Sequence, residues 1–397
     1  HRQRQRVHRL HAAAYVRHQK AATYLIMFTI FSAAAFIEGT TLTHVFGVDR
    51  LMALTYRIYQ LSVLGVLGKI FFLDDSTKKT KTGIFLTLAV LYFICHRAQA
   101  MAPFFMAIFI FGAVGVDWKK ILKCFFFTGL LLTCLSLFGA LFRIIPNMAQ
   151  SRTYFGIPFR RFSMGIATPT DFAAHVFSLM MASVLLRDFK CDKKCLILLS
   201  LIAFLTFALT DARLDLILMI LLLLCTAFYD KIKAFITASG PVFFGIIIGG
   251  YALFDLWITH VYYMPSRFWE TLDRFLSSRL FYGNVAMKQC QIPPIFGRFI
   301  PQNGNGLMLK PGERYFFIDS SIVRMWTMFG IVFTILMIML TAFLIIRGFS
   351  AKYVPLLVIL ALIVIESAID HHLWDISYNV LFVAAFADWS SLTKSQR

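Results

Sequence analysis

The chain has 397 residues, of which 59% are hydrophobic and 15% are charged, and its mean hydropathy is +0.73. A soluble domain is about half apolar and about a quarter charged, so this composition excludes a mainly soluble protein. The formal net charge of +19 does not indicate nucleic-acid binding, because the basic residues are scattered between apolar runs and form no face with interleaved aromatic residues. We therefore predict an all-α polytopic integral membrane protein that partners the lipid bilayer and no nucleic acid.

A basic segment at residues 1–21, which contains no acid, suits a cytoplasmic flank. Behind it come apolar runs long enough to cross a bilayer as helices. They predict about twelve transmembrane helices, nine within residues 22–259 and three within residues 320–388, before a cytoplasmic tail at 389–397. The expected helices are 22–38, 51–72, 83–97, 100–116, 121–143, 170–187, 195–210, 213–229, 236–259, 320–346, 353–367 and 374–388.

The connections between these helices set the expected orientation, because cytoplasmic loops carry an excess of Lys and Arg. With the N-terminus inside, every inside connection contains basic residues, for example 77–81, 118–120 and 187–194. An even number of helices returns the C-terminus to the same side. We therefore predict that both termini are cytoplasmic and that the polar clusters gather at the outer face.

The longest polar stretch is 260–319, which we expect to form a long external loop between the ninth and tenth helices. In an otherwise hydrophobic protein it carries five arginines, which are Arg267, Arg274, Arg279, Arg298 and Arg314. This concentration of charge makes the loop the place where chemistry is expected.

Two adjacent arginines, Arg160 and Arg161, stand shortly before Gly165 and the helix expected at 170. Guanidinium groups bind phosphate through paired hydrogen bonds and helix N-termini attract anions, so this cluster is a candidate diphosphate site. Arginines that lie along the lipid headgroups explain the same pattern without any function. The residues alone leave both interpretations open.

The stretch 210–215 places Asp211 and Arg213 between two strongly apolar helices. A carboxylate and a guanidinium at membrane depth are costly unless they are paired or line a wet cavity, which makes both candidates for function. The alternative is a capping Asp211 and an internal ion pair that only turn the helical hairpin.

Asp319 directly precedes the tenth expected helix, which contains Arg324. Asp before Ser-Ser is a good helix N-cap. A carboxylate at a membrane surface can also act as general base toward a sugar hydroxyl within hydrogen-bond reach. The charge of Arg324 needs a partner inside a membrane helix.

The last cluster contains Glu366, Asp370, His371, His372, Trp374 and Asp375 and leads to Tyr378-Asn379. Adjacent histidines point in different directions on a helix, and no third histidine lies nearby in the sequence, which argues against a metal site. The cluster is better explained as a base, as a sugar-binding patch with Trp374, or as part of an aromatic belt at the membrane interface. The seven cysteines show no paired metal-ligand spacing either.

Together these clusters resemble motifs of the Wzy-type polysaccharide repeat-unit polymerases, especially the capsule and exopolysaccharide branch of streptococci and lactobacilli, which is related to the O-antigen ligase superfamily. The resemblance covers roughly residues 155–390, in the order of the family. The similar stretches are Arg161–Gly165, Thr168–Thr170, Thr210–Arg213, Ser278–Leu280 with Phe296–Gly297, Asp319–Ile322 ending at Phe329–Gly330, and His372–Asn379. Three positions depart from the family pattern, since Thr170 and Ser320 replace Asn and Ile322 replaces Tyr.

The resemblance implies a GT-C-like fold in the bacterial plasma membrane with an active site that faces outward. It also implies an enzyme that joins oligosaccharide repeats carried on undecaprenyl diphosphate and releases undecaprenyl diphosphate, with a flippase and a chain-length regulator as partners. No carboxylate set suits a divalent cation well, so we expect neither metal nor cofactor. The arginines expected to bind the leaving diphosphate are Arg161, Arg213 and Arg279, supported by Arg160, Arg314 and Arg324. Candidates for the base are Asp319, then His372, then Asp211, and Trp374 and Asn379 are expected to bind substrate.

Two other functions remain open at this point. An O-antigen-ligase-like enzyme shares the long external loop, but usually has His-Asn where this chain has Asp319-Ser320. A flippase or other transporter belongs to a different class, whose sites lie near the bilayer midplane on broken helices and whose halves repeat. The two halves of this sequence show no repeat, and its polar residues gather at one expected face.

Overall fold

The computed structural model describes residues 2–154, 157–304 and 314–394, without the side chains of residues 2–18 and 393–394 and that of Tyr154. Most side chains of the predicted basic flank, and residues 395–397 of the predicted tail, therefore lie outside the described residues. Within them, η1 and η2 are π-helical, η3 and η4 are 3-10 helices, and β1 and β2 form a hairpin. The elements are α1 (Arg2–Glu38), α2 (Leu42–Phe46), α3 (Val48–Gly68), η1 (Lys69–Leu73), α4 (Lys78–Ala98), α5 (Ala102–Gly112), α6 (Trp118–Leu141), β1 (Ala149–Tyr154), β2 (Ile157–Phe162), α7 (Pro169–Leu186), α8 (Lys193–Thr210), α9 (Arg213–Ala227), α10 (Tyr229–Val261), α11 (Arg267–Phe275), α12 (Arg279–Cys290), α13 (Ser321–Arg324), η2 (Met325–Phe329), α14 (Gly330–Ser350), α15 (Val354–Ser367), η3 (His372–Trp374), η4 (Leu381–Ala385) and α16 (Ser390–Lys394).

Eight helices of the described residues are long and apolar enough to cross a membrane, as expected of a polytopic membrane protein. The predicted total of about twelve spans is not shown. The runs expected at 100–116, 213–229 and 353–367 form helices of only 11, 15 and 14 residues. At about 1.5 Å per residue such helices reach roughly 16–23 Å, which is short of the about 30 Å of a hydrocarbon core.

The helix predicted at 374–388 is wrong, because the chain there forms only η4 and irregular backbone. Polar side chains compete with a helix at its start. Asp375 Oδ1 accepts hydrogen bonds from the amide and the hydroxyl of Ser377, and Asn379 Oδ1 accepts one from the amide of Leu381. Non-helical backbone at membrane depth is tolerated where protein buries it and satisfies its polar groups. Most of this segment is buried.

Arg347, near the end of α14, satisfies several carbonyls of that segment. Its guanidinium donates to the carbonyl oxygens of Ala384 at 2.8 Å and Ala387 at 2.6 Å, and also to that of Ala385. It lies 4.1 Å from the centre of the Trp389 ring, a cation–π contact. One side chain thus anchors the C-terminal segment to α14.

We expect Arg347→Met to lower the free energy of unfolding by about 3 kcal/mol, because it removes charge-assisted hydrogen bonds and leaves carbonyls inside the protein unpaired. Thermal unfolding of the purified protein in detergent measures the loss. Lys194→Met, which removes an exposed positive charge on α8, serves as the control and should unfold like the wild type. Equal unfolding temperatures for the two variants would contradict the anchoring role.

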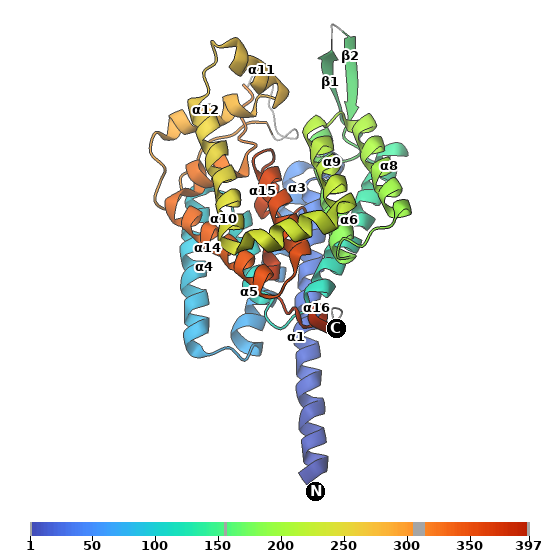
Figure 1. The fold of residues 1–397 in the computed structure, drawn as a ribbon, viewed down its shortest axis with the longest axis vertical. Coiled ribbons are helices and arrows are strands. Elements are labelled where there is room, and N and C mark those ends of the chain that lie inside the picture. Colours follow the sequence, from blue (N-terminus) through green and yellow to red (C-terminus); the bar gives the residue numbers. More distant parts are fainter. Residues whose placement is uncertain (1, 155–156, 305–313, 395–397) are drawn as a thin grey trace.

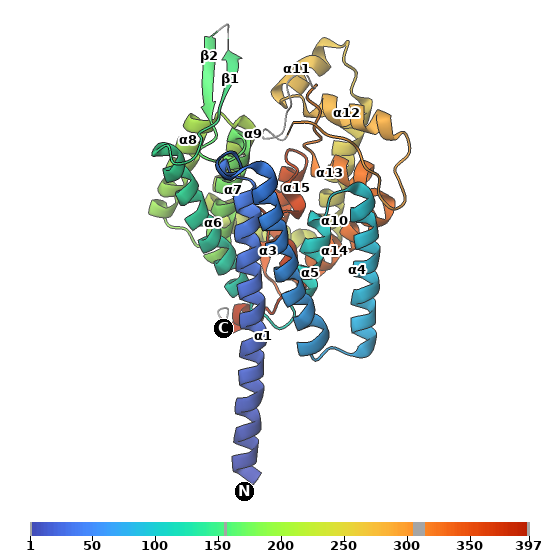
Figure 2. The ribbon, with the colours of Figure 1, turned by 180° about the vertical axis from the view of Figure 1, so that it is seen from behind.

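Two parts of the chain that were expected to be loops contain secondary structure. The stretch 260–319 forms α11 and α12, and the polar cluster around Arg160 forms the hairpin β1–β2, in which Ala149 pairs with Phe162 and Tyr154 with Ile157. Figures 1 and 2 show the hairpin and α11 and α12 at the end of the molecule opposite the N-terminus. Two of the polar segments predicted to lie on one side therefore lie at the same end of the molecule, and both contain secondary structure.

Long helix α10 is broken at Gly240 and Pro241. Gly240 has φ +73°, a backbone conformation that favours glycine, and Pro241 has no amide hydrogen to continue the helix. In Figure 1 the first part of α10 crosses the molecule and the second part runs up toward α12. Only this second part, which contains most of the predicted helix 236–259, runs along the direction of the other long helices.

Aromatic packing fixes the first helices against each other. Phe28 and Phe31 of α1 contact the ring of Phe109 on α5, with centroids 5.8 and 4.9 Å apart, and Phe31 also lies 4.6 Å from Tyr59 of α3. These contacts hold the C-terminal end of α1, which carries Glu38, beside α3 and α5.

Candidate active site

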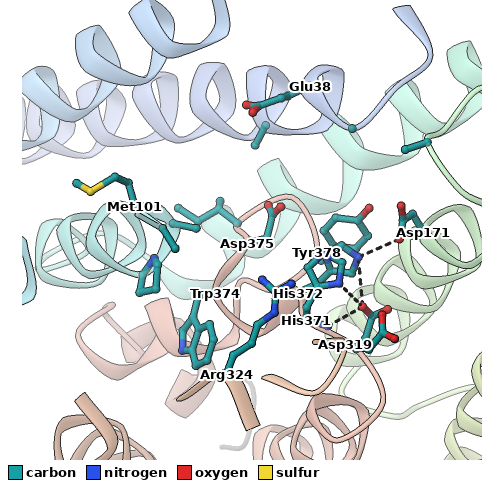
Figure 3. Close-up of a pocket in the computed structure, with 18 of the residues that line it drawn as sticks. Glu38, Met101, Asp171, Asp319, Arg324, His371, His372, Trp374, Asp375 and Tyr378 are labelled. Atoms are coloured by element: carbon teal, nitrogen blue, oxygen red, sulfur yellow. Dashed lines mark hydrogen bonds and ion pairs between the residues drawn. The ribbon is translucent and has the colours of Figure 1, made fainter. Parts of the chain in front are cut away.

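A polar cavity of about 500 Å³ lies where several of these elements meet. Its volume is typical of small-molecule sites, which measure about 300–1,000 Å³. Its walls come from α1, α3, the start of α5, the start of α7, and the segments 315–324 and 370–378. Charged and imidazole side chains that line it are Glu38, Asp171, Arg279, Asp319, Arg324, Asp370, His371, His372 and Asp375, most of which Figure 3 labels.

His372 lies between two carboxylates in this cavity. Its Nε2 is 3.3 Å from Oδ1 of Asp171 and 3.4 Å from Oδ1 of Asp370, and its ring stacks on Tyr378 with centroids 3.5 Å apart. Burial alone would lower the pKa of His372, but Asp370 and Asp171 outweigh it and raise this pKa to about 9. The imidazole of His372 is therefore protonated at neutral pH.

The two residues that precede His372, Asp370 and His371, have lowered pKa values. Burial and the adjacent positive charge of His372 lower the pKa of His371 to about 4, so His371 is neutral at pH 7. Burial opposes ionisation of Asp370, yet His372 and His371 together hold its pKa below the ordinary value. Asp370 is therefore a buried carboxylate whose charge is matched by His372.

Two arginines face the cavity from different elements. Arg279, the first residue of α12, donates from Nε to the carbonyl of Ile369. Arg324 donates from Nε to the carbonyl of Ile318 at 2.6 Å and lies 4.6 Å from the centre of the Phe317 ring. Backbone carbonyls thus hold both guanidinium groups in place, with positive charge directed toward the cavity.

Asp319 lies near both arginines. The helix is capped by Ser320 and not, as predicted, by Asp319, since Ser320 Oγ accepts the amide hydrogen of Val323 at 3.1 Å. The Asp319 carboxylate is therefore left to the cavity. Burial raises the pKa of Asp319, and the charges of Arg279 and Arg324 offset part of the effect. The cavity therefore combines positive charge with carboxylates.

Comparison of the chain with models of protein families, with curated proteins and with solved structures found no match.

Of the residues predicted for the site, Arg279, Asp319, Arg324, His372 and Trp374 line the cavity. Elements more than 90 residues apart in the sequence bring them together, since Arg279 begins α12 and His372 begins η3. The fold therefore brings these five residues to the wall of one cavity.

Arg161 and Asp211 meet elsewhere. Arg161 Nε donates to the carbonyl of Thr210 at 2.8 Å and lies 4.0 Å from Oδ2 of Asp211, which forms a closer ion pair with Arg152 at 3.0 Å. These contacts tie the hairpin β1–β2 to the connection between α8 and α9. Neither Arg161 nor Asp211 lines the polar cavity.

The remaining predicted residues do not line the polar cavity. Arg160 and Arg314 are exposed, and Arg213 is half-buried at the start of α9. Asn379 is buried, where its Nδ2 donates to the carbonyl of Leu373 at 2.8 Å. Its amide therefore shapes the C-terminal segment.

The sequence did not single out Glu38 and Tyr59, which also line the cavity. Glu38 lies across the cavity from Asp319 and Arg324. Tyr59 donates its hydroxyl hydrogen to Oε2 of Glu38. A glutamate at the end of an apolar run was the available signal, because a carboxylate at membrane depth needs a partner or a wet cavity. Glu38 adds a carboxyl group to those of Asp171, Asp319, Asp370 and Asp375 in the cavity.

One group of the described residues has the geometry to hold a metal ion. Ligand atoms of Asp370, His371 and His372 all lie within 4.8 Å of one another. A protonated imidazole has no lone pair for a metal, and His372 carries its proton between Asp370 and Asp171. With His372 protonated, the group is an ion-pair cluster in which the imidazolium lies between Asp370 and Asp171.

Proposed function

We propose that this protein is a membrane glycosyltransferase that joins oligosaccharide repeats carried on a polyprenyl diphosphate, as the resemblance to Wzy-type polymerases implies. The observation that carries the proposal is the meeting of Arg279, Asp319 and His372 in one polar cavity. Each belongs to a different stretch of the resemblance. If the similarity of these short motifs arose by chance, Arg279, Asp319 and His372 would not be expected to line the same cavity.

The positive groups of the cavity suit a diphosphate leaving group. When the bond between the anomeric carbon of the donor and its phosphate oxygen breaks, negative charge develops on the diphosphate. Arg279, Arg324 and protonated His372 are held in place before the reaction by Ile369, Ile318 and the two carboxylates beside His372. Preorganised charge of this kind is usually the largest single catalytic contribution.

A second hollow supports a lipid-linked substrate. It has a volume of about 310 Å³, is lined almost wholly by apolar side chains of α4, α5, α14 and the C-terminal segment, and shares Pro103 and Trp374 with the polar cavity. A diphosphate in the polar cavity can therefore direct its isoprenoid chain past Trp374 into this hollow. We propose that the hollow binds the first isoprene units of one substrate.

Filling this hollow should weaken binding of the lipid. Ala107→Trp places a large ring in the hollow from α5. The ring takes up space that the isoprenoid chain would fill, and each Å² of apolar contact that the chain loses is worth about 25 cal/mol. We therefore expect the KM for the undecaprenyl-linked substrate to rise about tenfold. A substrate with a tail too short to enter the hollow serves as the control and should show the same KM with both proteins. An equal increase for both tail lengths would contradict the proposed tail position.

We place the cavity at the outer leaflet of the bacterial plasma membrane, with both termini in the cytoplasm. The basic connections support this orientation, since 77–81 and 187–194 lie at the opposite end of their helices from the hairpin and α12. An outer site needs a flippase to deliver its substrates, and a chain-length regulator to limit its product.

Transport is the second candidate, and interrupted helices favour it. The span Ser321–Ser350 contains η2 and a change of direction at Gly330, where φ is +86°, and α10 is broken at Gly240. Transporters bind their substrates on such broken helices. The fixed charge pattern of the cavity fits bond cleavage at a diphosphate better than passage of a whole glycan.

Product analysis separates these functions. Purified protein in liposomes receives synthetic undecaprenyl-diphosphate repeats without added metal. A polymerase produces a ladder of longer lipid-linked glycans. A ligase-like enzyme produces no ladder and transfers one glycan to a separate acceptor. If labelled substrate crosses the membrane and no glycan grows, the glycosyltransferase proposal is wrong.

A further inference from the structure

We infer that the wall formed by the ends of α1 and α3 is the acceptor subsite, where Glu38 takes the proton from the attacking sugar hydroxyl. This inference rests on the proposed function, and it assigns a general base that the sequence motifs do not contain. The position of Glu38, its hydrogen bond with Tyr59 and the charges around it support this assignment.

Glu38 is the last residue of α1 and lines the polar cavity. Figure 3 shows it across the cavity from Asp319 and Arg324. Tyr59 donates to Oε2 of Glu38, and packing of the Tyr59 ring 4.6 Å from that of Phe31 fixes this donor. The carboxylate of Glu38 therefore has a defined orientation in the wall of the cavity.

Charges divide the cavity into two walls. On one wall, Asp171 and Asp370 pair with His372, and Asp319 lies near Arg279 and Arg324. On the other wall, no Lys, Arg or His among the described residues forms an ion pair with Glu38. A neighbouring positive charge makes a carboxylate a weaker proton acceptor. Of these carboxylates, Glu38 is thus the best placed to accept a proton.

The side chains around Glu38 also suit a sugar. Tyr56, which is half-exposed, and Tyr59 line the same wall, and their rings offer an apolar face and a polar edge. Asp375 lies near Glu38, but its Oδ1 already accepts two hydrogen bonds from Ser377. These bonds tie Asp375 to the C-terminal segment, so that it is a fixed carboxyl neighbour of Glu38.

The reaction balances with these groups. The hydroxyl oxygen of the acceptor sugar forms a bond to the anomeric carbon of the donor, and the bond from that carbon to the phosphate oxygen breaks. The electron pair of the broken bond stays on the departing polyprenyl diphosphate, which Arg279 and Arg324 stabilise. The hydroxyl proton passes to Glu38 and then to water. No oxidant, reductant or metal enters the balance.

Glu38→Gln tests this assignment, because the amide has the same shape and its oxygen can still accept the hydrogen bond from Tyr59. We expect kcat for glycan extension to fall at least about a hundredfold, with the KM for the lipid-linked donor changed less than about threefold. Glu270→Gln, which neutralises an exposed glutamate on α11 outside the cavity, is the matched control and should keep wild-type rates.

A pH profile of Glu38→Asp gives an independent result if the amide variant does not fold. This variant keeps a carboxylate on a shorter side chain, so the acidic limb of kcat should move and activity should stay above about a tenth of the wild type. An unchanged acidic limb would show a merely structural role and overturn the inference.

The failures of the two proposals are distinguishable. If the wild type forms no glycan ladder, the proposed function fails and the inference fails with it. If the wild type forms a ladder and folded Glu38→Gln extends glycans within threefold of its rate, the function stands and the assignment of Glu38 is wrong.

Discussion

Replacing Arg279 by alanine should lower the rate of glycan extension about a thousandfold, which corresponds to roughly 4 kcal/mol of transition-state stabilisation. Arg279 lines the polar cavity, and the carbonyl of Ile369 fixes its guanidinium. Alanine removes a charge that faces the leaving diphosphate. The effect should fall mainly on kcat, because that charge matters most when the bond to phosphate breaks.

Two comparisons make the Arg279 result specific. Arg279→Lys keeps the charge but loses the paired donors of the guanidinium, so we expect intermediate activity. Arg160→Ala removes an arginine that is exposed on β2, and we expect it to keep activity within about threefold of the wild type. Loss of activity in Arg160→Ala with full activity in Arg279→Ala would move the site from the cavity to the hairpin.

Raising the pH above about 9 should slow extension progressively, because His372 then loses its proton. Its pKa is raised from the ordinary value of about 6.5, so the imidazolium is present at neutral pH and disappears on the alkaline side. Above pH 9 the rate should fall about tenfold per pH unit. The stabilising ion pairs of His372 are likewise complete below about pH 6.5 and are lost as the pH rises through the folded-state pKa.

His372→Gln should remove this alkaline limb and lower the rate at pH 7.5 about a hundredfold, because the neutral amide cannot supply the positive charge. The measurement is the rate of extension between pH 6 and pH 10. His44→Gln, which replaces an exposed histidine on α2, is the control and should keep the wild-type profile. An alkaline limb that persists in His372→Gln would assign it to another group.

The apolar runs of the sequence predicted the long membrane helices, for which length and hydropathy are sufficient signals. They failed at 374–388, where Asp375 and Asn379 use their side chains to hold non-helical turns inside an apolar sequence. Hydropathy is the same for a buried helix and a buried irregular segment. The tertiary contact with Arg347, which satisfies carbonyls of this segment, is not visible in the sequence pattern.

The site was partly predictable for a different reason. Arg279, Asp319 and His372 are polar residues in unusual places, so they attract notice in a membrane sequence. Arg161 and Asp211 attract the same notice, but they contribute to contacts between the hairpin and α8, which no spacing reveals. Conversely, Glu38 ends an ordinary apolar helix, and its function becomes visible once α3 places Tyr59 beside it.

A structure of the protein with undecaprenyl diphosphate bound tests the central claim most directly. We expect the diphosphate to contact Arg279 and Arg324 in the polar cavity, with the isoprenoid chain running past Trp374 into the apolar hollow. A diphosphate bound at Arg160 on the hairpin, with the cavity free of lipid, would contradict the account.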